Sequence, residues 1–188
     1  MTETSSALYL KDLPDQLRKL KALADRAVAQ VRDEDLTAVL DPESNSLAHL
    51  LQHMGGNLLS RFTDFLTSDG EKPDRDRDSE FELKPETTRA DLLARWEEGF
   101  RVLFAALDEL TEDDLTKTVL IRAEPHTVVR ALDRALTHTA YHVGQIVFLA
   151  KHLKSSDWKT LSIARGHSED FNKSQESSTS VYTKGALK

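Results

Sequence analysis

Apolar side chains recur at steps of three and four residues in four long stretches of this chain. This spacing lines them up along one face of an α-helix. It predicts a first helix over about 8–31, a second from Ser46 to the polar break at 68–70, a third after Thr88 and a fourth over about 127–153. Four long helices without a convincing sheet predict an all-α protein, a four-helix bundle.

The segments between the expected helices are polar. Residues 70–88 are highly charged, hold two prolines and show no period, so they predict a long loop. Ser44 or Asn45 is placed to cap the second helix, and Asp91 to complete a capping box at the third. A brief extended piece is expected over 118–121.

One domain is expected over residues 1–172, followed by a C-terminal tail over 173–188. The tail is rich in Ser and Thr, which is typical of a weakly held terminus. Its apolar side chains, Val181, Tyr182 and Leu187, are the ones that would hold it against the domain. Between the fourth helix and the tail, we expect irregular structure.

Composition excludes several classes of function. The 188 residues include no Cys, which rules out disulfides, thiolate zinc sites and Cys nucleophiles, and which fits a cytoplasmic protein. A formal net charge of −7 argues against a nucleic-acid partner. No apolar run approaches the roughly 20 residues of a membrane span, and we expect no signal peptide. The pattern therefore favours small-molecule chemistry.

Two pairs of histidines share one spacing. His49 and His53 are four residues apart on the second predicted helix, and His138 and His142 are four apart on the fourth. Residues i and i+4 lie one above the other on a helix face, so two such imidazoles can aim at one point. His53, His138 and His142 stand among apolar neighbours, where a buried imidazole needs a partner. They are candidate ligands of one divalent transition-metal ion.

Glycines accompany these histidines inside the helical patterns. Gly55 and Gly56 follow His53, and Gly144 follows His142. Each costs about 1 kcal/mol relative to Ala within a helix. Such a cost is easiest to understand where two backbones approach closely. If the second and fourth helices touch at this level, His53 faces the pair formed by His138 and His142. The alternative is that the glycines only relieve crowding around aromatic neighbours.

Other polar residues share these faces. Asn57 and Gln145 are candidates to orient a water, a substrate or a ligating ring, and Arg61 is a candidate substrate contact. In the charged loop, Arg75 or Arg77 could clamp an anionic substrate. The simpler interpretation of that loop is a solvated run of ion pairs.

Three neutral imidazoles leave a coordination position open, as in catalytic sites. A metal there could activate water or a thiol. The alternative is a non-catalytic, dimeric metal- or ligand-binding stress-response protein, whose site a fourth ligand would close; His49 and His167 are the candidates. A third hypothesis is that the histidines only pack. Imidazole suits zinc, nickel, iron and copper alike, so the residues do not choose the metal.

Three stretches carry a family resemblance. They are HMGGNLLSRFTDFLTSDGEKPDRDRDSEF (53–81), HTAYHVGQIVFLAKHL (138–153) and WKTLSIARGHSEDFN (158–172), with GEKP…RD.EF and HxxxHxGQI as their motifs. In them the chain resembles the DinB/YfiT-like superfamily, in a branch whose members are mostly uncharacterised. One departure is that Ala164 and His167 stand where the family usually has Pro and Gln. His167 thereby adds a candidate base or metal contact.

The resemblance implies an up-down-down-up four-helix bundle, frequently a homodimer. It implies a metal triad of one histidine from the second helix and two from the fourth, which here are His53, His138 and His142. Relatives look like metal-dependent transferases that join a low-molecular-weight thiol to an electrophile, or like hydrolases. A thiol S-transferase or hydrolase with zinc or nickel is therefore the implied activity.

Overall fold

The computed structural model describes residues 3–179, and its first unit, residues 1–155, is a helical bundle. Four helices make it up: α1 (Ser5–Val28), α2 (Leu47–Phe62), α3 (Arg89–Asp108) and α4 (Val128–Lys154). All four were predicted. The apolar positions that predicted them form the core, which includes the fully buried Leu17, Leu50, Trp96, Leu103 and Ile146.

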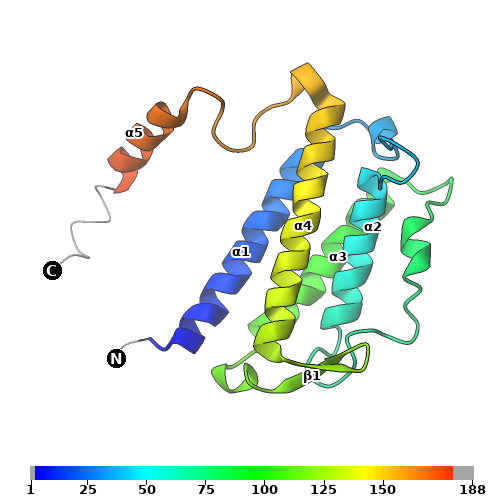
Figure 1. Cartoon of the computed structure of the whole chain (residues 1–188), viewed down its shortest axis with the longest axis vertical. Helices are drawn as coiled ribbons and strands as arrows, with labels where there is room; N and C mark the ends of the chain where they lie inside the picture. Colours follow the sequence, from blue (N-terminus) through cyan, green and yellow to red (C-terminus); the bar gives the residue numbers. More distant parts are fainter. Residues whose placement is uncertain (1–2, 180–188) are drawn as a thin grey trace. The chain divides into compact units, whose positions relative to one another are not determined.

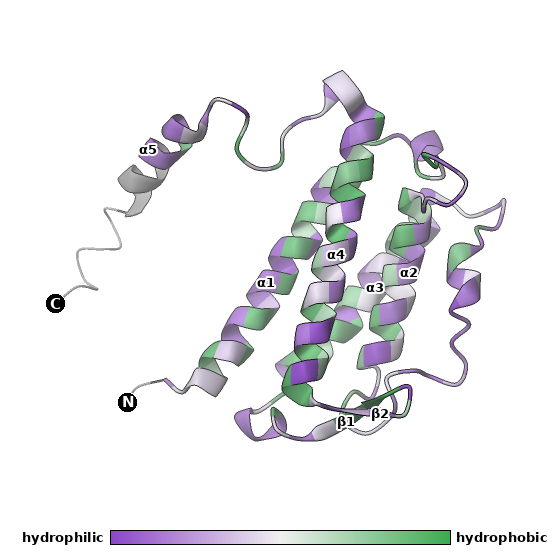
Figure 2. Cartoon of the chain, in the orientation of Figure 1, coloured by the Kyte–Doolittle hydropathy of each residue, from purple (hydrophilic) through white to green (hydrophobic). Residues whose placement is uncertain are grey.

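The bundle runs up-down-down-up (Figure 1). Since α2 and α3 point the same way, the chain must run back along the length of the bundle after α2 ends and before α3 begins. The charged segment after Gly70 makes this return, and it is largely hydrophilic along its length (Figure 2). The segment was predicted as a loop, but it contains a short 3-10 helix, η2 (Asp78–Phe81), which packs against α2. The topology thus explains why this connection is long.

Side-chain caps begin the helices. Ser46 caps α2 by accepting a hydrogen bond from the backbone N–H of His49 at 3.3 Å, so the expected cap at Asn45 or Ser44 was wrong by one or two positions. Thr88 and Asp91 form the predicted capping box of α3. The second helix ends at Phe62 rather than at residues 68–70, because Thr63 adopts extended backbone angles.

Glycine allows a close approach, but between α2 and α3. A Cβ on Gly55 would lie 2.5 Å from the backbone oxygen of Arg95, and one on Gly99 would lie 2.7 Å from the backbone oxygen of Gly55. A Cβ on Gly144 would meet nothing within 4 Å. α2 and α4 do contact each other, but the glycines do not mark that contact: Gly55 and Gly99 allow α3 to pack closely against α2.

A hairpin connects α3 to α4. The predicted extended piece is β1 (Thr118–Ile121), and it pairs antiparallel with β2 (Glu124–Thr127), which was not predicted. The turn residues Arg122 and Ala123 have φ angles of 56° and 61°, a left-handed conformation that favours glycine. The carboxylate of Asp69 accepts from both of their backbone N–H groups, at 2.8 and 2.7 Å, and so holds the turn.

The second unit comprises residues 156–188 and carries one described helix, α5 (Ser168–Thr179). Irregular structure was expected there, so α5 corrects that prediction over 168–172 and continues into the predicted tail. The boundary at 172/173 stays a prediction. Val181, Tyr182 and Leu187 lie outside the described residues. Among those described, no helix is both long and apolar enough to cross a membrane.

Candidate metal centre

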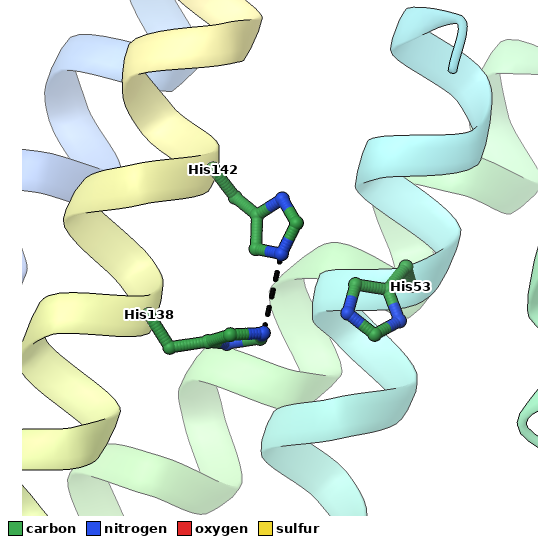
Figure 3. Close-up of side chains that lie close together, drawn as sticks. All are labelled: His53, His138 and His142. Carbon is green, nitrogen blue, oxygen red and sulfur yellow. Dashed lines mark hydrogen bonds between the residues drawn. The ribbon is translucent and has the colours of Figure 1, made fainter. Parts of the chain in front are cut away.

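Three histidine side chains meet between α2 and α4. His53 projects from α2, and His138 and His142 project from successive turns of α4 (Figure 3). One ring nitrogen from each lies within 4.8 Å of the others. The Nε2 atoms of His138 and His142 are 3.1 Å apart, and the His53 ring centroid lies 5.4 and 5.0 Å from theirs. The fold brings together the three residues that the sequence pattern selected.

The surroundings of the two α4 histidines favour neutral rings. The pKa of His138 is lowered to about 3, mainly because the ring is buried. Electrostatic repulsion from His142, His53 and two arginines lowers it further. Burial also lowers the pKa of His142, and the hydrogen bond to Gln145 offsets part of that effect. A neutral imidazole keeps one lone pair, which is the form that binds a metal ion.

A buried carboxylate holds His53. The Oε2 atom of Glu80, whose side chain is 1% exposed, lies 2.8 Å from His53 Nδ1. A carboxylate only accepts, so Nδ1 of His53 carries a proton and donates it to Glu80. Arg75 donates to both Glu80 oxygens, at 2.8 and 2.9 Å. Burial raises the pKa of Glu80, but the hydrogen bonds from His53 and Arg75 outweigh it and hold that pKa below its usual value.

Gly56 makes room for this carboxylate. A Cβ at Gly56 would overlap Glu80 Oε1 and approach Arg95 Nη2 to 2.8 Å. The charged loop therefore does more than form solvated ion pairs: η2 brings Glu80 against α2. The sequence placed Glu80 in the GEKP…RD.EF motif, but its contact with His53 was not predicted, because the two residues are 27 positions apart and the segment shows no period. Besides the motif, Gly56 was a signal, since it leaves the space that the Glu80 carboxylate fills.

An amide holds His142 in the same manner. Gln145 Oε1 lies 2.8 Å from His142 Nδ1, and Gln145 Nε2 lies 3.4 Å from the Tyr141 hydroxyl. Because the amide oxygen accepts, Nδ1 of His142 carries its proton and Nε2 faces His138 with a lone pair. The expectation that Gln145 could orient a ligating ring agrees with this contact.

The remaining candidates lie elsewhere. Asn57 and Arg61 line a cavity beside His138, and one Arg61 nitrogen donates to the Gly70 carbonyl and to Glu71. His49 Nδ1 accepts from the Ser46 backbone N–H at 3.1 Å, so His49 serves the start of α2 rather than the cluster. A role for His167, which belongs to the second unit, stays a prediction.

The three rings face an open depression. It has a volume of about 560 Å³ and is bordered by Asn45, Arg77, Phe81 and Tyr141 besides the three histidines. The guanidinium of Arg77 lies over the Phe81 ring at 5.1 Å, and Tyr141 is 63% exposed. A small molecule can reach the cluster from this side, against aromatic, amide and cationic groups.

The donor set fits a divalent transition metal. In His53 and in His142, Nδ1 is hydrogen-bonded to an acceptor, which leaves Nε2 to coordinate the ion. Histidine ligands in proteins generally have their second ring nitrogen hydrogen-bonded in this way. Within the described residues the group has three members, all nitrogen donors, which suits zinc, nickel, copper or iron rather than calcium or magnesium. Three ligands and an open side are typical of catalytic rather than structural zinc.

Fold and site together define a YfiT-like helical bundle with a three-histidine cluster. The fold is similar to that of YfiT from Bacillus subtilis, described as a probable metal-dependent hydrolase with an unusual four-helix bundle topology. The TM-score is 0.64 at 19% identity, covering 85% of this chain and 94% of that one. The chain belongs to the DUF1572 family of proteins of unknown function, which matches residues 4–167. No curated protein matches the sequence.

Proposed function

We propose that His53, His138 and His142 bind one divalent transition-metal ion, zinc or nickel, and that the protein is a metal-dependent enzyme. Its reaction would be transfer of a low-molecular-weight thiol to a small electrophile, or hydrolysis of that electrophile. The observation that carries the proposal is the convergence of three ring nitrogens within 4.8 Å beside an open depression.

A bound divalent ion would lower the pKa of a coordinated thiol or water and polarise an electrophile. The chain's own residues prepare the site for that chemistry. Glu80 and Gln145 hold the rings of His53 and His142 in one orientation, so that little reorganisation is needed on binding. Arg77, which lies over the Phe81 ring, and Tyr141, whose hydroxyl accepts from Gln145, border the approach to the site.

The alternative function is a non-catalytic metal- or ligand-binding stress-response protein. That hypothesis requires a fourth protein ligand to close the site. In the described part of the chain the cluster consists of three histidines, and His49 is engaged at the start of α2. These observations favour the enzyme over the binding protein.

We further propose that the protein is a cytoplasmic homodimer. Phe148 on α4 is a large aromatic side chain that is 63% exposed, and a second copy of the chain would cover it. A dimer mass in light scattering, reduced to a monomer mass by Phe148→Glu, is the expected result, and a monomeric wild-type protein would contradict it.

Elemental analysis of protein purified without a His tag tests the metal proposal. The wild type should carry close to one equivalent of metal and a His142→Ala variant much less. His152→Ala, at an exposed position on the same helix, is the matched control and should retain the metal. Equal metal content in all three would reject the site. Turnover in a screen of thiols and electrophiles then separates the enzyme from the binding protein.

A further inference from the structure

A small cavity lies beside His138, and apart from His138 its lining residues differ from those of the open depression. It has a volume of about 50 Å³, between α2, α4 and β1. Its polar lining comes from Asn57, Arg61, Arg134 and His138, and its apolar walls include Phe62, Phe65 and Ile121. One water needs roughly 10–15 Å³ measured in this way, so the cavity has room for a group of several heavy atoms.

The two arginines that line the cavity differ in what they already bind. Arg61 is 8% exposed, and it donates to the Gly70 carbonyl and to Glu71 at 2.7 Å. Arg134 has no carboxylate within ion-pair distance in the part of the chain whose side chains the structure describes. Arg130, one turn earlier on α4, pairs with Glu124 at 3.6 Å. Arg134 is therefore the guanidinium left free to bind a ligand.

The charge at this cavity is positive. No carboxylate belongs to its lining, although the protein as a whole has a net charge of −7. The fields of Arg134 and Arg61 both reach the His138 ring, where each helps to lower its pKa. Glu71 already pairs with Arg61, and Arg134 is an exposed residue, so Arg134 carries the charge that an anion entering the cavity could still pair with.

We propose that this cavity binds the substrate of the histidine centre and that the substrate is a small organic carboxylate. The carboxylate would lie on Arg134, and a short hydrocarbon part would lie against Phe62, Phe65 and Ile121, beside His138. This inference rests on the proposed function, because the ligand is taken to be what the metal centre acts on.

The numbers of charges and donors select a carboxylate. A guanidinium offers parallel N–H groups that match the two oxygens of a carboxylate. One free guanidinium balances one negative charge, whereas a phosphate dianion would keep a charge unmatched among aromatic walls. A neutral ligand would gain nothing from Arg134, and a cation would be repelled.

Titration with propanoate, followed by ¹H–¹⁵N NMR on metal-free and zinc-loaded protein, tests the proposal, because its five heavy atoms match a cavity of about 50 Å³. The expected result is saturable shifts of the amide signals of residues that line the cavity, with affinity about tenfold weaker in Arg134→Gln, as expected for loss of one charged hydrogen-bonding partner. Arg130→Gln, which changes a neighbouring arginine outside the cavity, should bind propanoate as the wild type does. Propanol, propylamine and inorganic phosphate should bind more weakly than propanoate.

Unchanged affinity in Arg134→Gln would overturn the proposal, as would propanol binding equal to that of propanoate or phosphate binding tighter than propanoate. The outcomes also separate the two proposals. Propanoate binding at the cavity of a protein that fails to bind added zinc would support the anion site while rejecting the metal centre. Zinc binding without any propanoate binding would reject the anion site alone.

Discussion

Replacing Glu80 by Gln should weaken metal binding while leaving all three histidines in place. The carboxylate accepts from His53 Nδ1 and from two nitrogens of Arg75, which makes three donors at 2.8–2.9 Å. A glutamine has one acceptor oxygen and adds an NH₂ group that needs an acceptor of its own. It can no longer satisfy all three donors, so His53 is released from its single orientation.

The expected losses of metal affinity and of stability follow from the two residues that lose hydrogen bonds, His53 and Arg75. Changing a group that orients a metal ligand typically weakens metal affinity 10- to 100-fold, which is about 1.4–2.8 kcal/mol. The metal-free protein should also lose about 1–3 kcal/mol of stability, because the buried Arg75 guanidinium then loses one of the two carboxylate oxygens that accept its hydrogen bonds. Arg75 keeps Glu71 at 3.1 Å, which limits that loss.

Zinc affinity is measured by competition with a chromophoric chelator, and ¹⁵N NMR reports the tautomer of His53 in the metal-free protein. The wild type should show His53 protonated at Nδ1, and Glu80→Gln should show a mixture of tautomers. Glu82→Gln is the matched control, since Glu82 is an exposed acid in the same loop. A folded Glu80→Gln protein that binds zinc within twofold of the wild type would refute the positioning role.

Three further changes test other parts of the structure. Zinc at 100 times its Kd should stabilise the wild type by about 2.7 kcal/mol in thermal melts, and an equal gain in His142→Ala would contradict the site. Gly144→Ala should stabilise α4 by about 0.5–1 kcal/mol, whereas Gly55→Ala should destabilise the protein because its Cβ would lie 2.5 Å from the Arg95 carbonyl oxygen. Urea unfolding with the same sign for both would refute the packing argument. Ala123→Gly should add about 1 kcal/mol by relieving a φ of 61°, and lower stability in urea would show that the turn is unstrained.

The periodic spacing of residues along the chain was enough to predict most of the fold and the histidine cluster. Helix faces follow from steps of three and four residues, and the spacing of His138 and His142 places both rings on one face of α4. Which helix packs against a given face is a long-range property. The glycines beside His53 indicated a close approach but not its partner, which is α3.

Contacts made by non-periodic segments could not be predicted. Glu80 reaches His53 across 27 residues, by way of a loop whose path depends on the parallel arrangement of α2 and α3. The turn at Arg122 and Ala123 lacks the glycine or asparagine that signals a tight hairpin, since Asp69 stabilises it from a distant segment. Both features depend on side chains that meet only in the folded chain.

X-ray absorption spectroscopy of the zinc-loaded, untagged protein tests the central claim most directly, because it counts the imidazoles around the ion. We expect a first shell with three imidazole nitrogens at about 2.0–2.1 Å and a further light ligand. His53→Ala should reduce the imidazole count to two. A shell of oxygens with one imidazole or none, or the same shell in His53→Ala, would contradict the metal centre.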